Sequence, residues 1–264
     1  MLSIFNWFGC RDLNHAEGIR LIKQAGFEGV LVWWDFADGG EDFRMQPELA
    51  RRAGLFVENM HTPFDKIQHI WEDNAAGQAL FDYYMMCVDD CAAFGIPTMV
   101  MHAHKRGIHM PGDLRLGLER FKRIVDRAER LGVNVAMENQ RSATQLVLAP
   151  WLLEEIVSPR FGFCLDSGHH NAREQDVDML ARFGHRLMAL HLHDNDASDD
   201  MHLLPYDGTT DWAAQMRAIA ETGYKGPTTL EVVNEGYDGM PPAEFLAIAY
   251  ERAKRLEGLR LECL

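Results

Sequence analysis

Short apolar stretches alternate with longer amphipathic stretches along the whole chain. The short stretches are rich in β-branched and aromatic residues, as buried strands are. The longer ones repeat apolar positions every three to four residues, which is typical of helices that cover a sheet. Eight strands are predicted, over Leu2–Phe8, Gly29–Asp35, Leu55–Pro63, Thr98–His104, Asn134–Asn139, Phe161–Gly168, Leu187–Asp194 and Thr228–Asn234.

The clearest predicted helix covers Asp113–Leu131, with Asp113 as a candidate N-cap and Gly132 as the residue that ends it. Similar apolar stripes at helical spacing begin at Phe81 and at Phe245. Because strands and helices alternate without a linker or a change of composition, we expect parallel strands joined by right-handed crossovers.

The predicted fold class is α/β, a (β/α)₈ TIM barrel in which residues 1–264 form one domain. The length of 264 residues is close to the roughly 250 that such barrels typically use. The competing architecture is an open doubly wound sheet. It is disfavoured because no Gly-rich phosphate-binding motif follows the first strand, which continues as Asn6-Trp7-Phe8-Gly9-Cys10. A barrel predicts that the chemistry lies at the carboxyl ends of the strands.

Polar residues stand where six consecutive predicted strands end. Burial of a carboxylate or an imidazole is costly unless the group is paired or bound to a metal. One such residue is usually a hydrogen-bonded core or rim residue. Six that converge at the mouth of the barrel, the end where the carboxyl ends of its strands meet, indicate a functional site. The six are His61, His102, Glu138, Asp166, His191 and Glu231.

Four of these residues form a set of three carboxylates and one imidazole on adjacent strands. Such oxygen-rich ligation suits one divalent metal ion, and Mn²⁺, Zn²⁺, Co²⁺ and Mg²⁺ all remain candidates. Two carboxylates that contact substrate beside the metal could each move a proton, while the metal polarises a carbonyl group. The predicted ligands are Glu138, Asp166, His191 and Glu231.

The strand-end motifs Met137-Glu138-Asn139, Leu165-Asp166-Ser167-Gly168-His169, His191-Leu192-His193-Asp194 and Leu230-Glu231 resemble those of the xylose-isomerase-like barrel superfamily. This superfamily contains sugar (phosphate) isomerases and epimerases, inosose isomerases and dehydratases, and endonuclease IV. The resemblance implies that Glu138 and Glu231 are the acid/base pair as well as metal ligands, and that His169 contacts substrate oxygens. An Arg that grips substrate in the ketose epimerases has no counterpart in Asn195-Asp196-Ala197-Ser198.

The expected activity is therefore a metal-dependent isomerisation or epimerisation of a small sugar, sugar phosphate or keto-polyol by proton transfer next to a carbonyl. A dehydratase begins with the same step. His202 is expected to touch substrate hydroxyls. His61 and His102 would line the pocket, and Trp33 would supply an aromatic wall. The segment from Asn195 to Asp211 is longer than most connections and is predicted to be a lid.

Four basic residues follow strands three to five at the mouth and could bind a phosphate, but solvated loop charge is the interpretation that we favour. They are Lys66, Lys105, Arg106 and Arg141.

Two other function classes stay open. The resemblance to endonuclease IV offers a candidate for each of nine ligands of a three-metal site that cleaves phosphodiesters. The third class is a barrel that binds a sugar or a metal without turnover. The nine candidates are His61, His102, Glu138, Asp166, His169, His191, Asp200, His202 and Glu231.

Composition and charge limit the classes of partner that we expect. The formal net charge of −14 repels polyphosphate backbones, so nucleic acid is not an expected partner. No apolar run is long enough to span a membrane, the first residues lack the basic-then-apolar layout expected of a signal peptide, and the five cysteines are scattered. We therefore expect a cytoplasmic protein that acts on a small carbohydrate. A homodimer is one assembly that the resemblance allows.

Overall fold

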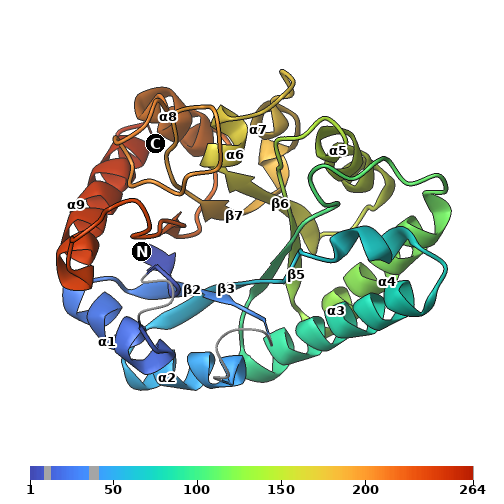
Figure 1. The fold of residues 1–264 in the computed structure, drawn as a ribbon, viewed down its shortest axis with the longest axis horizontal. Helices are drawn as coiled ribbons and strands as arrows, with labels where there is room; N and C mark the ends of the chain where they lie inside the picture. Colours follow the sequence, from blue (N-terminus) through green and yellow to red (C-terminus); the bar gives the residue numbers. More distant parts are fainter. Residues whose placement is uncertain (9–12, 36–41, 264) are drawn as a thin grey trace.

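Eight parallel strands form a ring that is surrounded by helices (Figure 1). The computed structural model describes residues 1–8, 13–35 and 42–263. The strands follow one another in the order β7-β6-β5-β4-β3-β2-β1-β8. A parallel bridge between Leu192 and Leu230, just past the end of β7, joins the two edges and nearly closes the barrel. The predicted (β/α)₈ barrel is therefore confirmed.

Each predicted strand is present, and all eight end earlier than the sequence pattern suggests. The predicted strand over Thr98–His104, for example, stops at Met101, because the following polar residues leave the ladder and turn into the mouth. The bounds are β1 Leu2–Phe5, β2 Gly29–Trp33, β3 Phe56–His61, β4 Thr98–Met101, β5 Asn134–Glu138, β6 Phe161–Asp166, β7 Leu187–His191 and β8 Thr228–Leu230.

Capping side chains start several of the helices. The Asn14 side chain accepts a hydrogen bond from the Glu17 amide at 2.8 Å. The predicted cap at Asp113 is wrong in position: the helix begins at Arg115, and the Asp113 carboxylate binds the Arg115 amide and guanidinium instead. The helices are α1 His15–Ala25, α2 Gln46–Arg52, α3 Ala75–Phe94, α4 Arg115–Leu131, α5 Gln145–Glu155, α6 Ser167–Asn171, α7 Met179–Phe183, α8 Trp212–Glu221 and α9 Pro242–Leu261, with 3₁₀ turns at Phe43–Met45 (η2), Ile67–Trp71 (η3) and Gly184–Arg186 (η4).

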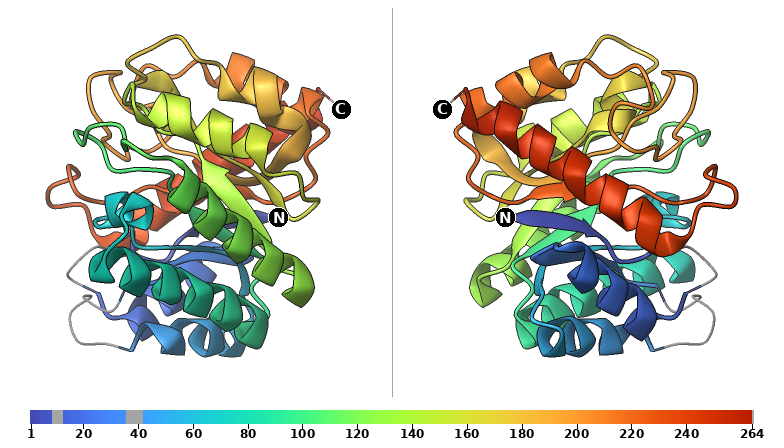
Figure 2. Two further views of the ribbon diagram at one scale, coloured as in Figure 1. Left: turned by 90° about the vertical axis from the view of Figure 1, so that its right-hand side faces the viewer. Right: turned by 90° about the vertical axis from the view of Figure 1, so that its left-hand side faces the viewer.

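The long helices lie outside the ring. Figure 2 shows α3 and α4 side by side on one flank and α9 running across the opposite flank. None of the helices in the described ranges is long and apolar enough to cross a membrane. Of the cysteines in those ranges, Cys87, Cys91 and Cys164 are buried and Cys263 is exposed, and all four are free; Cys10 lies outside them.

Small apolar side chains fill the barrel interior below the mouth. They form a buried cluster of their own, Val100, Ala136, Cys164 and Ala189. Each lies two residues before a polar residue at a strand end, and a spacing of two puts both side chains on the same face of a strand. The polar residues that they support are His102, Glu138, Asp166 and His191.

Candidate functional site

A cavity of about 240 Å³ opens at the carboxyl ends of the strands, where a barrel is expected to place its chemistry. This volume lies just under the roughly 300 Å³ at which typical ligand pockets begin, so the cavity suits a small ligand. Its lining comes from the ends of β3, β4, β5 and β8 and from the segments that follow β3 to β7. The lining residues are His61, Phe64, His102, His104, Lys105, Arg106, Glu138, Gln140, Arg141, Gln145, His169, Asp200, His202 and Glu231.

The structure brings the four predicted metal ligands together. Glu138, Asp166, His191 and Glu231 are buried, and each offers one ligand atom within 4.8 Å of the others. His191 Nδ1 lies 3.5 Å from Glu138 Oε2 and 3.4 Å from Glu231 Oε2. It has no hydrogen-bond partner within the described ranges. An unpaired buried nitrogen between converging carboxylates is a donor set that fits a divalent cation.

Glu138 lies at the centre of the cluster. Its Oε2 is 2.9 Å from His61 Nε2 and 3.4 Å from His102 Nε2, and its Oε1 is 3.2 Å from His169 Nδ1. Burial alone would raise the pKa of Glu138, but the charges of His102 and His61 outweigh it and hold that pKa well below its ordinary value. Burial also opposes ionisation of Glu231, whereas neighbouring His191 lowers its pKa to about 2. The surrounding histidines therefore favour the carboxylate form of both groups.

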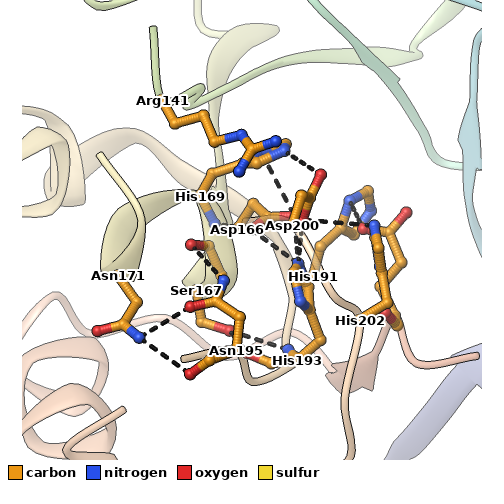
Figure 3. A network of polar contacts seen from close by, with 12 residues as sticks. Arg141, Asp166, Ser167, His169, Asn171, His191, His193, Asn195, Asp200 and His202 are labelled. Carbon is orange, nitrogen blue, oxygen red and sulfur yellow. Dashed lines mark hydrogen bonds and ion pairs between the residues drawn. The ribbon is translucent and has the colours of Figure 1, made fainter. Parts of the chain in front are cut away.

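Hydrogen bonds fix the orientation of the third carboxylate, Asp166 (Figure 3). Its Oδ1 accepts from the His169 amide at 2.6 Å and so caps the short helix α6. His193 Nε2 reaches the two oxygens at 3.0 and 3.1 Å. The Asn139 side chain binds both the amide and the carbonyl of Asp166, at 2.7 and 2.8 Å. The motif after β6 thus holds one carboxylate in a fixed direction.

A second polar group surrounds Asp200, on the segment after β7 (Figure 3). Asp200 Oδ2 is 3.0 Å from His169 Nε2, and Asp200 Oδ1 is 3.5 Å from His202 Nε2. The rings of His193 and His202 stack at 4.1 Å. His193, Asp200 and His202 form another group that could hold a metal ion, as do His61, Glu138 and His191. The structure therefore gathers all nine residues of the alternative ligand set around one mouth.

The segment from Asn195 to Asp211 is fastened at its base by the carboxylate of Asp194. Its Oδ1 accepts from the amides of Asn195 and Thr210, at 3.0 and 3.1 Å. Its Oδ2 accepts from the Tyr206 amide at 3.0 Å and from Trp212 Nε1 at 2.9 Å. The base of the segment is thus fixed, and its residues Asp200 and His202 form part of the cavity wall. Opening of the segment as a lid stays a prediction.

His202 lies in the cavity wall in a left-handed backbone conformation, with φ of 47°. Its Nδ1 is 2.7 Å from the carbonyl oxygen of Glu231, which links the loop to the end of β8. Burial lowers the pKa of His202, but the nearby Asp200 carboxylate raises it more, to about 10. A cationic imidazole can donate hydrogen bonds to ligand oxygens.

The predicted aromatic wall is only partly in place. Trp33 packs against His61 with ring centroids 5.0 Å apart, and it is not among the residues that line the cavity. Phe64 lines the cavity instead and stacks on His102 at 4.2 Å. The sequence signal for Phe64 is its position directly after the strand-end motif Met60-His61-Thr62-Pro63, which carries it to the mouth.

The interpretation of the mouth cations as solvated charge is wrong for Arg141. Arg141 is only 7% exposed and lines the cavity together with Lys105 and Arg106, whereas Lys66 lines a different depression. Arg141 Nη2 donates to Asp199 Oδ1, and Arg106 Nη1 lies 3.5 Å from the same oxygen. Spacing alone could not show the burial, because Arg141 follows the strand in a loop.

Comparisons with known proteins agree on one family. The sequence profile described as "Xylose isomerase-like TIM barrel" matches residues 19–255. The chain is 29% identical over 300 residues to "Uncharacterized protein y4fM" of Sinorhizobium fredii, with 97% of this chain and 94% of that protein covered. It is 27% identical over 250 residues to the "Ketose 3-epimerase" of Arthrobacter globiformis, which covers 85% of this chain and 80% of that enzyme.

Solved structures show the same fold. The structure of an L-ribulose 3-epimerase superposes with a TM-score of 0.77, covering 99% of this chain and 96% of that one. The sequence identity of 16% means that this likeness speaks for the fold alone.

Proposed function

Because the chain belongs to the xylose isomerase-like TIM barrel family, we propose that it is a divalent-metal-dependent ketose epimerase. The observation that carries this proposal is the pair Glu138 and Glu231. Both side chains lie in the cavity wall, and both lie within 3.5 Å of the same nitrogen, Nδ1 of His191. The name of the ketose 3-epimerase relative supports the same reaction.

Glu138, Asp166, His191 and Glu231 would hold the metal ion, and their chemistry suits Mn²⁺, Co²⁺, Zn²⁺ or Mg²⁺. A divalent cation held there would polarise the carbonyl of a ketose, which would make the proton on the adjacent carbon easier to remove.

The two glutamates divide the proton transfer. Epimerisation removes a proton from one face of a carbon and delivers a proton to the other face, so it needs a group on each side. Glu138 and Glu231 would take these two roles. The histidines around Glu138 stabilise its charge, and the backbone link between Glu231 and His202 fixes the end of β8.

The other polar side chains of the cavity would orient the sugar. His169 and His202 would contact hydroxyl groups from the side of β6 and β7, and His61 and His102 from the side of β3 and β4. The small cavity favours a monosaccharide over a polymer.

Deuterium exchange tests the proposal. The protein is loaded with Mn²⁺ or Co²⁺ and incubated in D₂O with a panel of ketoses, and the products are followed by NMR. We expect deuterium at the carbon next to the carbonyl together with formation of the epimer, both lost on chelation and restored by metal. A metal-loaded protein that exchanges no proton in any ketose would contradict the proposal and would favour a binding barrel.

A multinuclear phosphodiesterase like endonuclease IV is the second candidate, favoured by the two further metal-capable groups, His61–Glu138–His191 and His193–Asp200–His202. The net charge of −14 opposes it, because a polyanionic substrate would be repelled. Elemental analysis of the purified protein separates the two. One ion per chain and no cleavage of abasic DNA supports the epimerase, whereas three ions with cleavage supports the nuclease.

A further inference from the structure

We propose that the substrate of this site carries an anionic group, a carboxylate or a phosphate, which binds to Arg141 with Lys105 and Arg106 beside it. The reaction named above rests on the proposed function. The anionic group is inferred separately, from the charges of the cavity.

The cavity lining carries charges of both signs. Glu138, Glu231 and Asp200 contribute carboxylates, as a metal site requires. Lys105, Arg106 and Arg141 contribute cations, from the segments that follow β4 and β5. A chain with a net charge of −14 thus places three cations in one small cavity. A ligand that matches both kinds of charge has a polar sugar part and an anionic group.

Arg141 is buried and incompletely paired. Its side chain is 9% exposed, and Nη2 donates to Asp199. Its Nη1 is buried and has no hydrogen-bond partner in the parts of the chain that the structure describes. A guanidinium carries five N–H donors in a planar fork, which a carboxylate or a phosphate can accept in pairs. The contact with Asp199 uses one oxygen and leaves half of the fork unmatched.

The two other buried arginines in the described ranges, Arg120 and Arg260, both donate to main-chain carbonyls. Arg120 Nη1 donates to the carbonyls of Ile70 and Glu72, at 2.9 and 2.8 Å. Arg260 Nη1 donates to the carbonyl of Tyr224 at 2.8 Å, while its Nε and Nη2 donate to Glu257. These arginines join neighbouring segments. Arg141 makes no such contact among the hydrogen bonds of the described residues, so structural locking does not account for it.

Asp199 is suited to give way to a ligand. Its side chain is 66% exposed, and Arg141 and Arg106 are the cations that it contacts. It lies beyond the fastened base of the segment after β7. An anionic ligand group can take its place on Arg141 and also accept from Nη1. Neighbouring Gln140 lines the same wall with a buried Oε1 that has no donor in the described ranges, which suits a ligand hydroxyl.

Binding of matched ketoses to the metal-loaded protein tests the inference. Isothermal titration compares D-ribulose with D-ribulose 5-phosphate, and D-fructose with D-fructuronate, its 6-carboxylate. We expect at least one anionic ketose to bind roughly 10- to 100-fold more tightly than its neutral parent, the range of charge-assisted hydrogen bonds. The pair that shows the difference identifies phosphate or carboxylate. Equal affinity within both pairs overturns the inference.

Variants show whether Arg141 carries the preference. Arg141→Gln should bring the ratio of the two dissociation constants to about one. Asp199→Asn removes the competing carboxylate and should tighten binding of the anionic ketose. Arg115→Gln is the matched control, because Arg115 pairs with Asp113 on the exposed start of α4, and it should keep the original ratio. A ratio that survives Arg141→Gln, or an anionic affinity that falls in Asp199→Asn, would contradict the inference.

The two proposals fail separately. An anionic preference that depends on Arg141, without deuterium exchange in any ketose, would remove the epimerase and keep the anion site. Exchange with equal affinities within each pair would keep the epimerase and remove the anion site.

Discussion

Gly168 lies directly against the imidazole ring of His193: a methyl group at Gly168 would be 1.9 Å from Cε1 of that ring. The same ring reaches both oxygens of Asp166. Glycine at this position is therefore what lets His193 hold the carboxylate, since any side chain would push the ring away.

Gly168→Ala should accordingly weaken metal binding without unfolding the barrel. Displacement of His193 removes a partner that orients Asp166, and loss of such a partner typically costs roughly 10- to 100-fold in metal affinity. Competition with a chelator measures the affinity. Gly258→Ala is the control, since a methyl group there meets open space. Equal affinities in the two variants would show that His193 does not position the ligand.

Asp166→Ala should abolish both stoichiometric metal and activity. The carboxylate is fully buried at the meeting point of the proposed ligands, and alanine offers no donor. Elemental analysis gives the metal content, and circular dichroism checks that the fold persists. Full metal occupancy in this variant would exclude Asp166 from the ligand set.

Glu138→Gln and Glu231→Gln should each lower turnover by at least the ~10²- to 10⁴-fold expected of a positioned acid/base group. Glutamine keeps a carbonyl oxygen for the metal, so metal affinity should fall less than activity. Both variants should lose epimerisation, while deuterium exchange survives in one, because one base can still remove its proton. Near-normal rates in both would place the chemistry elsewhere in the cavity.

Glu58 makes the folded state sensitive to pH. Burial raises its pKa to about 7, although its Oε1 accepts hydrogen bonds from Thr229 and Asn59. The folded state therefore binds the proton of the Glu58 carboxyl group more tightly than the unfolded state does. The contribution of Glu58 to the free energy of unfolding is most favourable below about pH 4.5, and it is lost as the pH rises toward and through 7.

Glu58→Gln removes this dependence. Relative to the original chain, the variant should gain roughly 2 to 3 kcal/mol in the free energy of unfolding between pH 5 and pH 8. Urea denaturation at pH 5 and pH 8 measures the free energy of unfolding of the variant and of the original chain. A cost of the glutamine amide that does not depend on pH cancels when the two pH values are compared. A pH-independent difference would mean that Glu58 titrates normally.

Asp194→Ala should loosen the segment after β7. The carboxylate accepts four N–H groups, so its removal should cost at least about 2 kcal/mol of stability, given 1.5–3 kcal/mol for a hydrogen bond to a charged group. Amide hydrogen exchange over residues 195–211 should speed up. Asp196→Ala is the control, because the Asp196 carboxylate bonds Ser198 within the exposed part of the segment and does not reach its base. Unchanged exchange would show that other contacts fasten the segment.

The sequence predicts the barrel and its mouth because both depend on local periodicity and on the common direction of parallel strands. Glu138, Asp166, His191 and Glu231 meet for that reason. Two features depend instead on how loops pack after the strands end. They are the burial of Arg141 and the presence of Phe64 in the cavity wall, where the sequence predicted Trp33. Loop packing depends on contacts such as that between Arg141 and Asp199, which are 58 residues apart in the chain.

The Asp194 carboxylate divides the segment after β7 into two parts. The root is the part whose amides it binds, at Asn195, Tyr206 and Thr210, and the tip is the exposed part, Asp196–Asp199. The root sets the position of His202 beside the ends of β7 and β8, whereas Asp196–Asp199 contributes no proposed metal ligand. Substitutions in the tip can therefore change which substituent the mouth accepts while the ligand set stays as it is. Exposed residues of this loop can thus be exchanged without any change among the four proposed metal ligands.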